Sequence, residues 1–193
     1  TMSDPADNTY AYTDAFGTQS DADYQLTKTL SDTNGGIDTL DFSAVTKGVW
    51  VDMYRLALIN GRYLDFYGSE IENLIGSNAD DFIVDSVANN IIYAGNGNDK
   101  IFSTLGDDYI DGGEGVDVAG FVRPVRDYQY TFVDSNTVIA THLGKVFQGY
   151  DADFGTDTYE NFERFIFSEV NRIGIGGETT SWEFSKVQLE EYM

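Results

Sequence analysis

The chain has 193 residues and a formal net charge of −22, because 33 Asp and Glu outnumber 11 Lys and Arg. This acidity argues against binding to a nucleic-acid backbone or an anionic membrane surface, since both would be repelled. The lack of cysteine excludes disulfides, thiolate metal sites and cysteine catalysis, and a single histidine, His142, argues against a histidine-rich zinc site within the chain.

Residues 1–66 are expected to form N-terminal strands. The first 30 residues are polar and acidic and alternate weakly, which predicts an arm with one or two strands. In the segment 31–45, Gly36-Ile37-Asp38-Thr39 echoes a Gly-x-Asp turn that occurs again at 115–118, so Asp38 is either a metal ligand or a plain turn carboxylate. The segment 49–59, VWVDMYRLALI, predicts a strand rather than a helix.

Residues 76–120 divide into five units of nine residues without an insertion: GSNADDFIV, DSVANNIIY, AGNGNDKIF, STLGDDYID and GGEGVDVAG. Position two is always small, position four is Ala or Gly, and position eight is Ile or Ala. Position six carries a carboxylate or an amide, in Asp81, Asn90, Asp99, Asp108 and Asp117. The preceding nine residues, 67–75, fit this frame in part, with Glu72 at position six.

Each unit predicts six residues of turn followed by three of strand, so two units close one turn of a flattened right-handed helix. Each turn then stacks on the unit after next, with 76–81, 94–99 and 112–117 on one side and 85–90 and 103–108 on the other. Stacked strands lie about 4.8 Å apart. An ion with Ca–O distances of about 2.3–2.6 Å fits between two such turns, whereas Mg²⁺ needs about 2.0–2.1 Å and octahedral geometry.

These units resemble the RTX family, the hemolysin-type calcium-binding repeats with the consensus GGxGxDxUx. The units 94–102 and 112–120 match best, whereas 85–93 carries Asn90 in place of Asp, which puts calcium on that side in question. The resemblance implies an all-β fold with a short right-handed parallel β-roll over 67–120. It also implies several Ca²⁺ ions, calcium-driven folding after export, and type I secretion to the extracellular space or the bacterial surface. The alternative is that some turns stack without a metal.

The metal ligands that the resemblance implies are turn carbonyls and side chains of the repeats. They are Gly76, Asn78, Asp81, Asn90, Ala94, Asn96, Gly97, Asp99, Ser103, Asp108, Gly112, Glu114 and Asp117.

Residues 121–193 are expected to form a C-terminal β region, so that strands and hairpins flank the roll as a sandwich-like part of one calcium-binding domain, 1–193. Alternation and a central Asp-Ser-Asn predict a β-hairpin over 127–141. The segment 149–169 resembles a common ending of RTX proteins, a G-T-D-T turn followed by N-x-E-x-x-x-F. Its acidic loop is either a further calcium site or a solvated loop, with Asp151, Asp153 and Asp157.

The chain has no GxSxG, P-loop or HExxH motif, and its many carboxylates make accidental pairs numerous, so we expect no enzymatic activity. Long, aromatic-rich flanks favour a calcium-dependent ligand-binding module of an RTX adhesin, a monomeric piece of a larger protein. Its partner would be a peptide or glycan on a host or microbial surface, bound by Tyr150, Asp153, Phe154, Arg123 and Arg126. Two alternatives are the non-catalytic folding and secretion β-roll of a secreted protease or polysaccharide-modifying enzyme, and a structural spacer.

Overall fold

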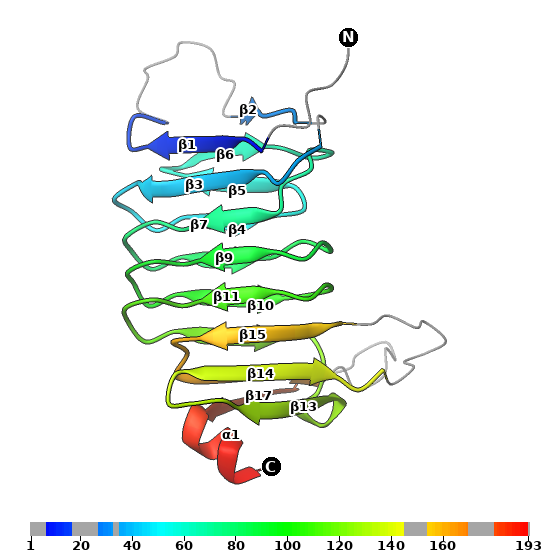
Figure 1. Cartoon of the computed structure of the whole chain (residues 1–193). Coiled ribbons are helices and arrows are strands. Elements are labelled where there is room, and N and C mark those ends of the chain that lie inside the picture. The colour runs from blue at the N-terminus through cyan, green and yellow to red at the C-terminus, as the bar shows by residue number, and fades with distance from the viewer. Residues whose placement is uncertain (1–6, 17–26, 33–34, 145–153, 170–179, 193) are drawn as a thin grey trace.

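The computed structural model describes residues 7–16, 27–32, 35–144, 154–169 and 180–192. In these ranges the chain winds as a flattened coil whose strands form two facing β-sheets. Figure 1 shows the strands stacked from the N-terminal end to the C-terminal end. None of the helices in these ranges is long and apolar enough to cross a membrane.

The strands of the described residues belong to two sheets, here called sheet A and sheet B. Sheet A has the spatial order β1 (Thr9–Thr13), β3 (Thr39–Ala44), β7 (Asn73–Ile75), β9 (Ile91–Tyr93), β11 (Tyr109–Asp111), β15 (Thr156–Glu160), β14 (Thr137–His142) and β13 (Tyr128–Phe132). Sheet B has the order β17 (Thr180–Ser185), β16 (Arg164–Glu169), β12 (Val118–Phe121), β10 (Lys100–Ser103), β8 (Phe82–Val84), β4 (Trp50–Asp52), β5 (Leu56–Ile59), β6 (Arg62–Asp65) and β2 (Thr27–Thr29). The short helices are η1 (Val125–Asp127) and α1 (Lys186–Tyr192).

The nine-residue frame produces the central part of both sheets. Successive strands alternate between the sheets, and each pairs in parallel with the strand two units away, as Ile101 does with Ile83 in sheet B and Ile110 with Ile92 in sheet A. The position-eight side chains point into the space between the sheets and are fully buried, in Ile83, Ile92, Ile101, Ile110 and Ala119. The parallel β-roll predicted from the repeat is therefore confirmed.

The N-terminal flank extends the same sheets instead of forming a separate layer. Strand β3 pairs in parallel with β7, and β1 pairs in parallel with β3. The segment 49–59 forms two antiparallel strands, β4 and β5, rather than the one strand predicted. A turn interrupts it because the Asp52 carboxylate accepts the Tyr54 N–H at 3.1 Å, and the Asp52 carbonyl accepts the Arg55 N–H at 2.9 Å.

The C-terminal flank adds one more coil to the roll and a hairpin beside it. Strand β15 pairs in parallel with β11, and β16 pairs in parallel with β12. The predicted hairpin is confirmed as β13 and β14, which are antiparallel. Its turn forms because the Asp134 carboxylate accepts the N–H groups of Asn136 and Thr137, both at 2.8 Å.

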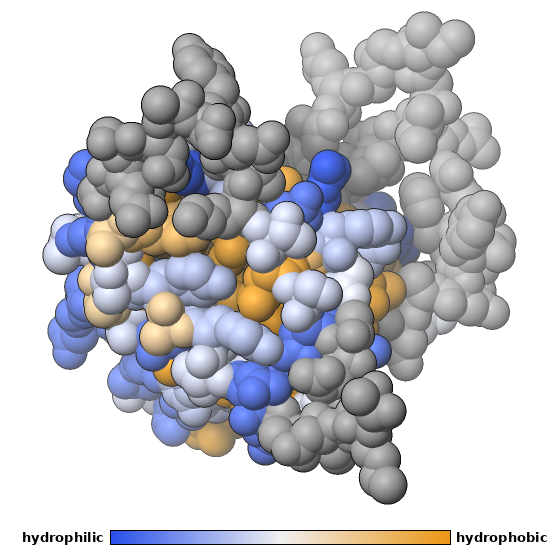
Figure 2. Space-filling view, turned by 90° about the horizontal axis from the view of Figure 1, so that it is seen from above, coloured by the Kyte–Doolittle hydropathy of each residue, from blue (hydrophilic) through white to orange (hydrophobic). Residues whose placement is uncertain are grey.

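A cluster of aromatic rings closes the core where the hairpin joins the roll. Phe121 lies at its centre, with ring-centroid distances of 4.7 Å to Phe167, 5.1 Å to Tyr128 and 5.1 Å to Tyr159. Burying such rings contributes most of the apolar stabilisation at this end. At the opposite end, Figure 2 shows apolar residues in the middle of the face and hydrophilic residues beside them.

Candidate metal sites

Two stacks of turns join the sheets on opposite sides of the roll (Figure 1). We call the turns that lead into sheet B the B-side turns and those that lead into sheet A the A-side turns. Close backbone contact between stacked turns explains the glycines at position four. Gly97 and Gly115 have φ of 144° and 150°, and a Cβ on Gly115 would lie 1.6 Å from the Gly97 carbonyl oxygen. Only glycine tolerates both conditions.

The B-side turns align their position-six carboxylates in a ladder, here called the B ladder. Its members are Asp81, Asp99, Asp117 and Glu163. The Asp81 N–H donates to Asp99 Oδ1 at 2.7 Å, the Asp99 N–H to Asp117 Oδ1 at 2.7 Å, and the Asp117 N–H to Glu163 Oε2 at 2.8 Å. Each turn is therefore tied to the next through a carboxylate that a backbone amide fixes in place.

Two oxygens of the B ladder match what a hard cation requires. Asp99 and Asp117 are fully buried, and the Oδ2 atom of each has no hydrogen-bond partner among the described residues. A buried anionic oxygen without a partner is costly, so an ion between the turns would remove a large penalty. Carboxylate and carbonyl oxygens are the ligands that Ca²⁺ prefers. The B-side residues therefore fit Ca²⁺.

Few carboxylates meet at any one point of these turns. Within the described ranges, no three or more His, Asp or Glu side chains are grouped so that they could hold a metal ion. An ion between two turns would therefore rely on one or two carboxylates together with backbone carbonyl oxygens, a ligand set that Ca²⁺ accepts.

Burial also disfavours the charged form of the ladder carboxyls. It is the largest cause that raises the pKa of Asp99 to about 7 and of Asp117 to about 6. The neighbouring carboxylates raise both values further, Asp81 and Asp117 in the case of Asp99, and Glu163 in the case of Asp117. Backbone N–H groups act in the opposite direction, because they stabilise the carboxylate.

These pKa values predict a pH dependence. Because the pKa values of Asp99 and Asp117 are raised in the folded protein above their ordinary value of 3.8, the chelated folded protein binds more protons than the unfolded chain from about pH 4 to about pH 7. Its stability should therefore fall as pH rises through this window. Calcium must displace those protons, so its affinity should increase over the same window. Calorimetric titrations at about pH 5 and about pH 8 measure this, and equal affinities would contradict it.

The A-side turns form a second ladder, here called the A ladder. It contains Asp38, Glu72, Asn90, Asp108 and Asp157. The Asp38 N–H donates to Glu72 Oε2 at 2.8 Å, the Asn90 N–H to Asp108 Oδ1 at 2.8 Å, and the Asp108 N–H to Asp157 Oδ1 at 3.1 Å. The Asn90 side-chain nitrogen donates to the Glu72 carbonyl at 2.7 Å, and this bond joins the pair Asp38 and Glu72 to the other three members of the ladder.

Side-chain hydrogen bonds fill the middle of the A ladder. Asn90 Oδ1 accepts both the Ser86 N–H at 3.0 Å and its hydroxyl at 3.1 Å. Asp157 Oδ2 accepts the hydroxyls of Ser103 at 2.9 Å and Tyr159 at 3.1 Å. These contacts supply polar partners from the protein itself, in contrast to the unpartnered oxygens of the B ladder.

A buried carboxyl that the sequence analysis missed lies beside this region. Asp85 is 2% exposed and accepts the Thr104 hydroxyl at 2.6 Å and its N–H at 3.0 Å. Burial, followed by the charge of Asp108, raises the pKa of Asp85 well above its ordinary value. Position one of the other nine-residue units is a small residue, so an Asp at this position is the sequence feature that could have identified Asp85. Glu163 was also missed as a ladder member, although Phe165 two residues later repeats the six-to-eight spacing.

The other predicted B-side residues lie where the frame places them. Asn96 donates from its side-chain nitrogen to Asn78 Oδ1 at 2.9 Å, and the Gly97 N–H donates to the Glu114 carbonyl at 2.9 Å. The smallest residues are packed backbone to backbone, because a Cβ on Gly76 would lie 2.2 Å from the Ala94 carbonyl oxygen. Gly112 continues this contact with the next coil, where its N–H donates to the Glu160 carbonyl at 2.9 Å.

The predicted flank loop is only partly described. Tyr150, Asp151 and Asp153 lie outside the described residues. Asp157 is 2% exposed and lies in β15 as a member of the A ladder, rather than in a solvated loop.

The two predicted arginines lie in different surroundings. The Arg123 guanidinium is 5.8 Å from the centre of the Phe154 ring, and its Nη2 is 3.1 Å from an oxygen of Asp127. Arg126 instead lines a cavity of about 420 Å³ with Pro124, Val125, Trp182, Phe184 and Tyr192.

Comparison with known proteins identifies the repeats. A family model described as the RTX calcium-binding nonapeptide repeat (4 copies) matches residues 67–101, 75–108 and 86–119. The segment 67–119 is therefore an array of RTX repeats, which bind Ca²⁺. No curated protein matches the chain. Among solved structures, the chain is similar to the extracellular lipase LipA from Serratia marcescens, at 16% identity and a TM-score of 0.47. The match covers 62% of this chain but only 18% of that chain.

Proposed function

We propose that this chain, whose residues 67–119 are RTX calcium-binding nonapeptide repeats, is a non-catalytic β-roll module that folds on Ca²⁺ after its parent protein is secreted. The observation that carries the proposal is a pair of buried oxygens in the B ladder, Oδ2 of Asp99 and of Asp117, that have no hydrogen-bond partner in the part of the chain that the structure describes. Without a cation the ladder places repelling charges in the interior, so calcium binding contributes directly to the free energy of folding.

The pairing of the flanks supports a role for the whole chain in this process. The flanking strands add to the edges of the repeat strands, β3 on β7 and both β15 and β16 on the last coil. Ordering the repeats therefore creates the edges on which the flanks pair. A module of this kind stays unfolded where calcium is scarce and folds where it is abundant, which suits type I secretion to the extracellular space.

A second candidate function is recognition of a peptide or glycan on a host or microbial surface, as in an adhesin, by a monomeric module of a larger protein. The cavity of about 420 Å³ beside η1 favours it, because Arg126 lines it together with three aromatic side chains, Trp182, Phe184 and Tyr192. Trp182 and Tyr192 are 54% and 58% exposed. Aromatic rings beside an arginine are typical of recognition sites for polar ligands.

A calcium titration followed by ligand arrays tests both functions. If the module folds after export, its folding midpoint should lie near about 10⁻⁴–10⁻³ M Ca²⁺, the range of extracellular modules. Folding at submicromolar calcium would contradict the proposal. Peptide and glycan arrays probed in millimolar calcium then decide the second candidate. Binding that Arg126→Ala abolishes would support recognition, and blank arrays would leave folding as the function.

A further inference from the structure

One turn that lies outside the matched repeats has the same geometry as the turns within them. In the sequence TNGGIDTL, Asp38 precedes β3, and Leu40 pairs in parallel with Leu74, as the position-eight residues of the repeats do. Leu40 is fully buried. Gly36, two residues before Asp38, has φ of 117°, in the same region as Gly97, two residues before Asp99. The family match begins only at residue 67.

The carboxylate of Asp38 has the same bonding pattern as those of Asp99 and Asp117. Its Oδ1 accepts the N–H of Asn8, the residue before β1, at 2.8 Å, as Asp99 Oδ1 accepts the N–H of Asp81. Its own N–H donates to the next carboxylate of the ladder, Glu72. Asp38 is fully buried, and its Oδ2 has no hydrogen-bond partner among the described residues.

We propose that Asp38 and Glu72 bind a Ca²⁺ ion between the turn 35–38, which lies outside the RTX repeats, and the turn 67–72, with which the matched repeats begin. The proposal rests on calcium binding by the repeats, and it extends that binding to the N-terminal flank. The remaining ligands are backbone carbonyl oxygens of the two turns, since Ca²⁺ needs six to eight oxygens. The same criterion assigns no ion to Asn90, Asp108 or Asp157, whose neighbours supply side-chain hydrogen bonds.

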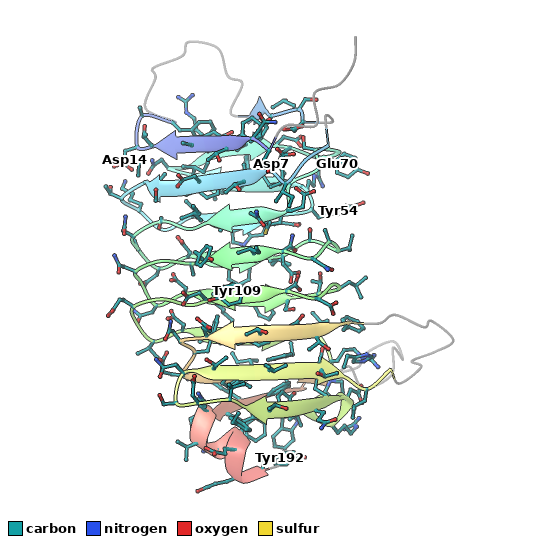
Figure 3. All side chains as sticks on the ribbon, viewed as in Figure 1. Asp7, Asp14, Tyr54, Glu70, Tyr109 and Tyr192 are labelled. Carbon is teal, nitrogen blue, oxygen red and sulfur yellow. The ribbon has the colours of Figure 1, made fainter. Side chains whose placement is uncertain are left out.

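The site has a structural consequence for the N-terminal end of the roll. Asp7 and Glu70 lie on the A side of the roll, and Asp14 lies on the other side (Figure 3). Asp7 Oδ1 accepts the Ile37 N–H at 2.8 Å, next to the Asn8–Asp38 bond. An ion at Asp38 therefore fixes the turn on which β1 pairs, so calcium also organises the first strand of sheet A.

Calorimetric counting of bound calcium tests the site. Asp38→Asn keeps an oxygen for the Asn8 N–H but replaces the unpartnered oxygen with NH₂, so one ion should be lost or bind at least about tenfold more weakly. Asp85→Asn is the matched control, a buried aspartate on the same side whose oxygens accept bonds from Thr104, and it should leave the ion count unchanged. An Asp38→Asn protein with the wild-type count and affinities would overturn the site.

Asp99→Asn separates this inference from the proposed function. Loss of ions in Asp99→Asn but not in Asp38→Asn would reject only the flank site, whereas a wild-type chain that binds no calcium would reject the function itself. If Asp38→Asn does not fold in calcium, a crystal of the wild-type chain grown in calcium decides. An anomalous peak within about 2.3–2.6 Å of Asp38 Oδ2 supports the site, and its absence there beside peaks at Asp99 and Asp117 overturns it.

Discussion

Removing calcium should unfold this protein. In excess chelator at about pH 8, where the ladder carboxyls are ionised, we expect far-UV circular dichroism to lose its β signal. Added Ca²⁺ should restore the signal, whereas Mg²⁺ should not, because it requires shorter bonds of about 2.0–2.1 Å in an octahedral arrangement. The spacing of stacked turns is set by the hydrogen bonds between their strands, about 4.8 Å, and cannot shrink to suit the smaller ion.

The magnitudes favour unfolding even though the core is well packed. A domain of this size has a net stability of about 5–15 kcal/mol. An ionised carboxylate buried without a compensating charge costs several kcal/mol. Asp99 and Asp117 are both buried, and among the described residues the Oδ2 atom of each has no hydrogen-bond partner. Asp81 and Asp108 are also buried, and the net charge of −22 adds repulsion across the whole chain. Together these penalties reach the size of the margin that the apolar core provides.

The aromatic cluster around Phe121 is the strongest argument against this expectation, because its apolar burial does not itself require an ion. A chelated protein that keeps its β signal and melts cooperatively would contradict the prediction. It would show that apolar burial alone holds the roll. Potassium chloride at matched ionic strength is the control, since it screens charge without filling a site.

Much of the fold could be predicted because the repeat determines both where each strand lies in the sequence and which of its side chains are buried. The nine-residue frame gives the strand spacing, and its fixed position eight gives the side that faces the core, so the pairing of Ile83 with Ile101 follows directly. The flanks lack such a frame. The alternation of polar and apolar residues in 49–59 predicts extended backbone. The turn at Asp52 depends instead on a hydrogen bond from the Tyr54 N–H to the Asp52 side chain, which the alternation of residue types does not predict.

The site was predictable to the level of residue type but not of ion occupancy. Position six identifies every ladder member from Asp81 to Asp117. Whether such a carboxylate has an oxygen left for a metal depends on its neighbours in three dimensions. Asp157 has two partners for one oxygen, Tyr159 and the distant Ser103, 54 residues away, whereas Asp99 has none for its Oδ2 within the described ranges. The hairpin of β13 and β14 lies between Ser103 and Asp157 in the sequence, so no local sequence pattern predicts the hydrogen bond between them.

The difference between the two ladders should appear in a matched pair of mutants. Asp99→Ala removes the carboxylate in the middle of the B ladder, together with the ion that its buried oxygen holds. Breaking such a buried charged contact typically costs about 3–5 kcal/mol, which for a chain of this length lowers Tm by roughly 6–20 °C. Asn90→Ala removes neutral hydrogen bonds to Ser86 and to the Glu72 carbonyl, each of which contributes about 0.5–1.5 kcal/mol.

In saturating Ca²⁺, Asp99→Ala should therefore melt at a lower temperature than Asn90→Ala, although Asn90 makes more hydrogen bonds. The number of bound ions separates the two causes, because it should fall in Asp99→Ala and stay at the wild-type value in Asn90→Ala. Differential scanning calorimetry and calorimetric calcium titration on the same samples provide both readings. Equal melting temperatures and equal ion counts would mean that the B ladder holds its turns by hydrogen bonds alone, as the middle of the A ladder does.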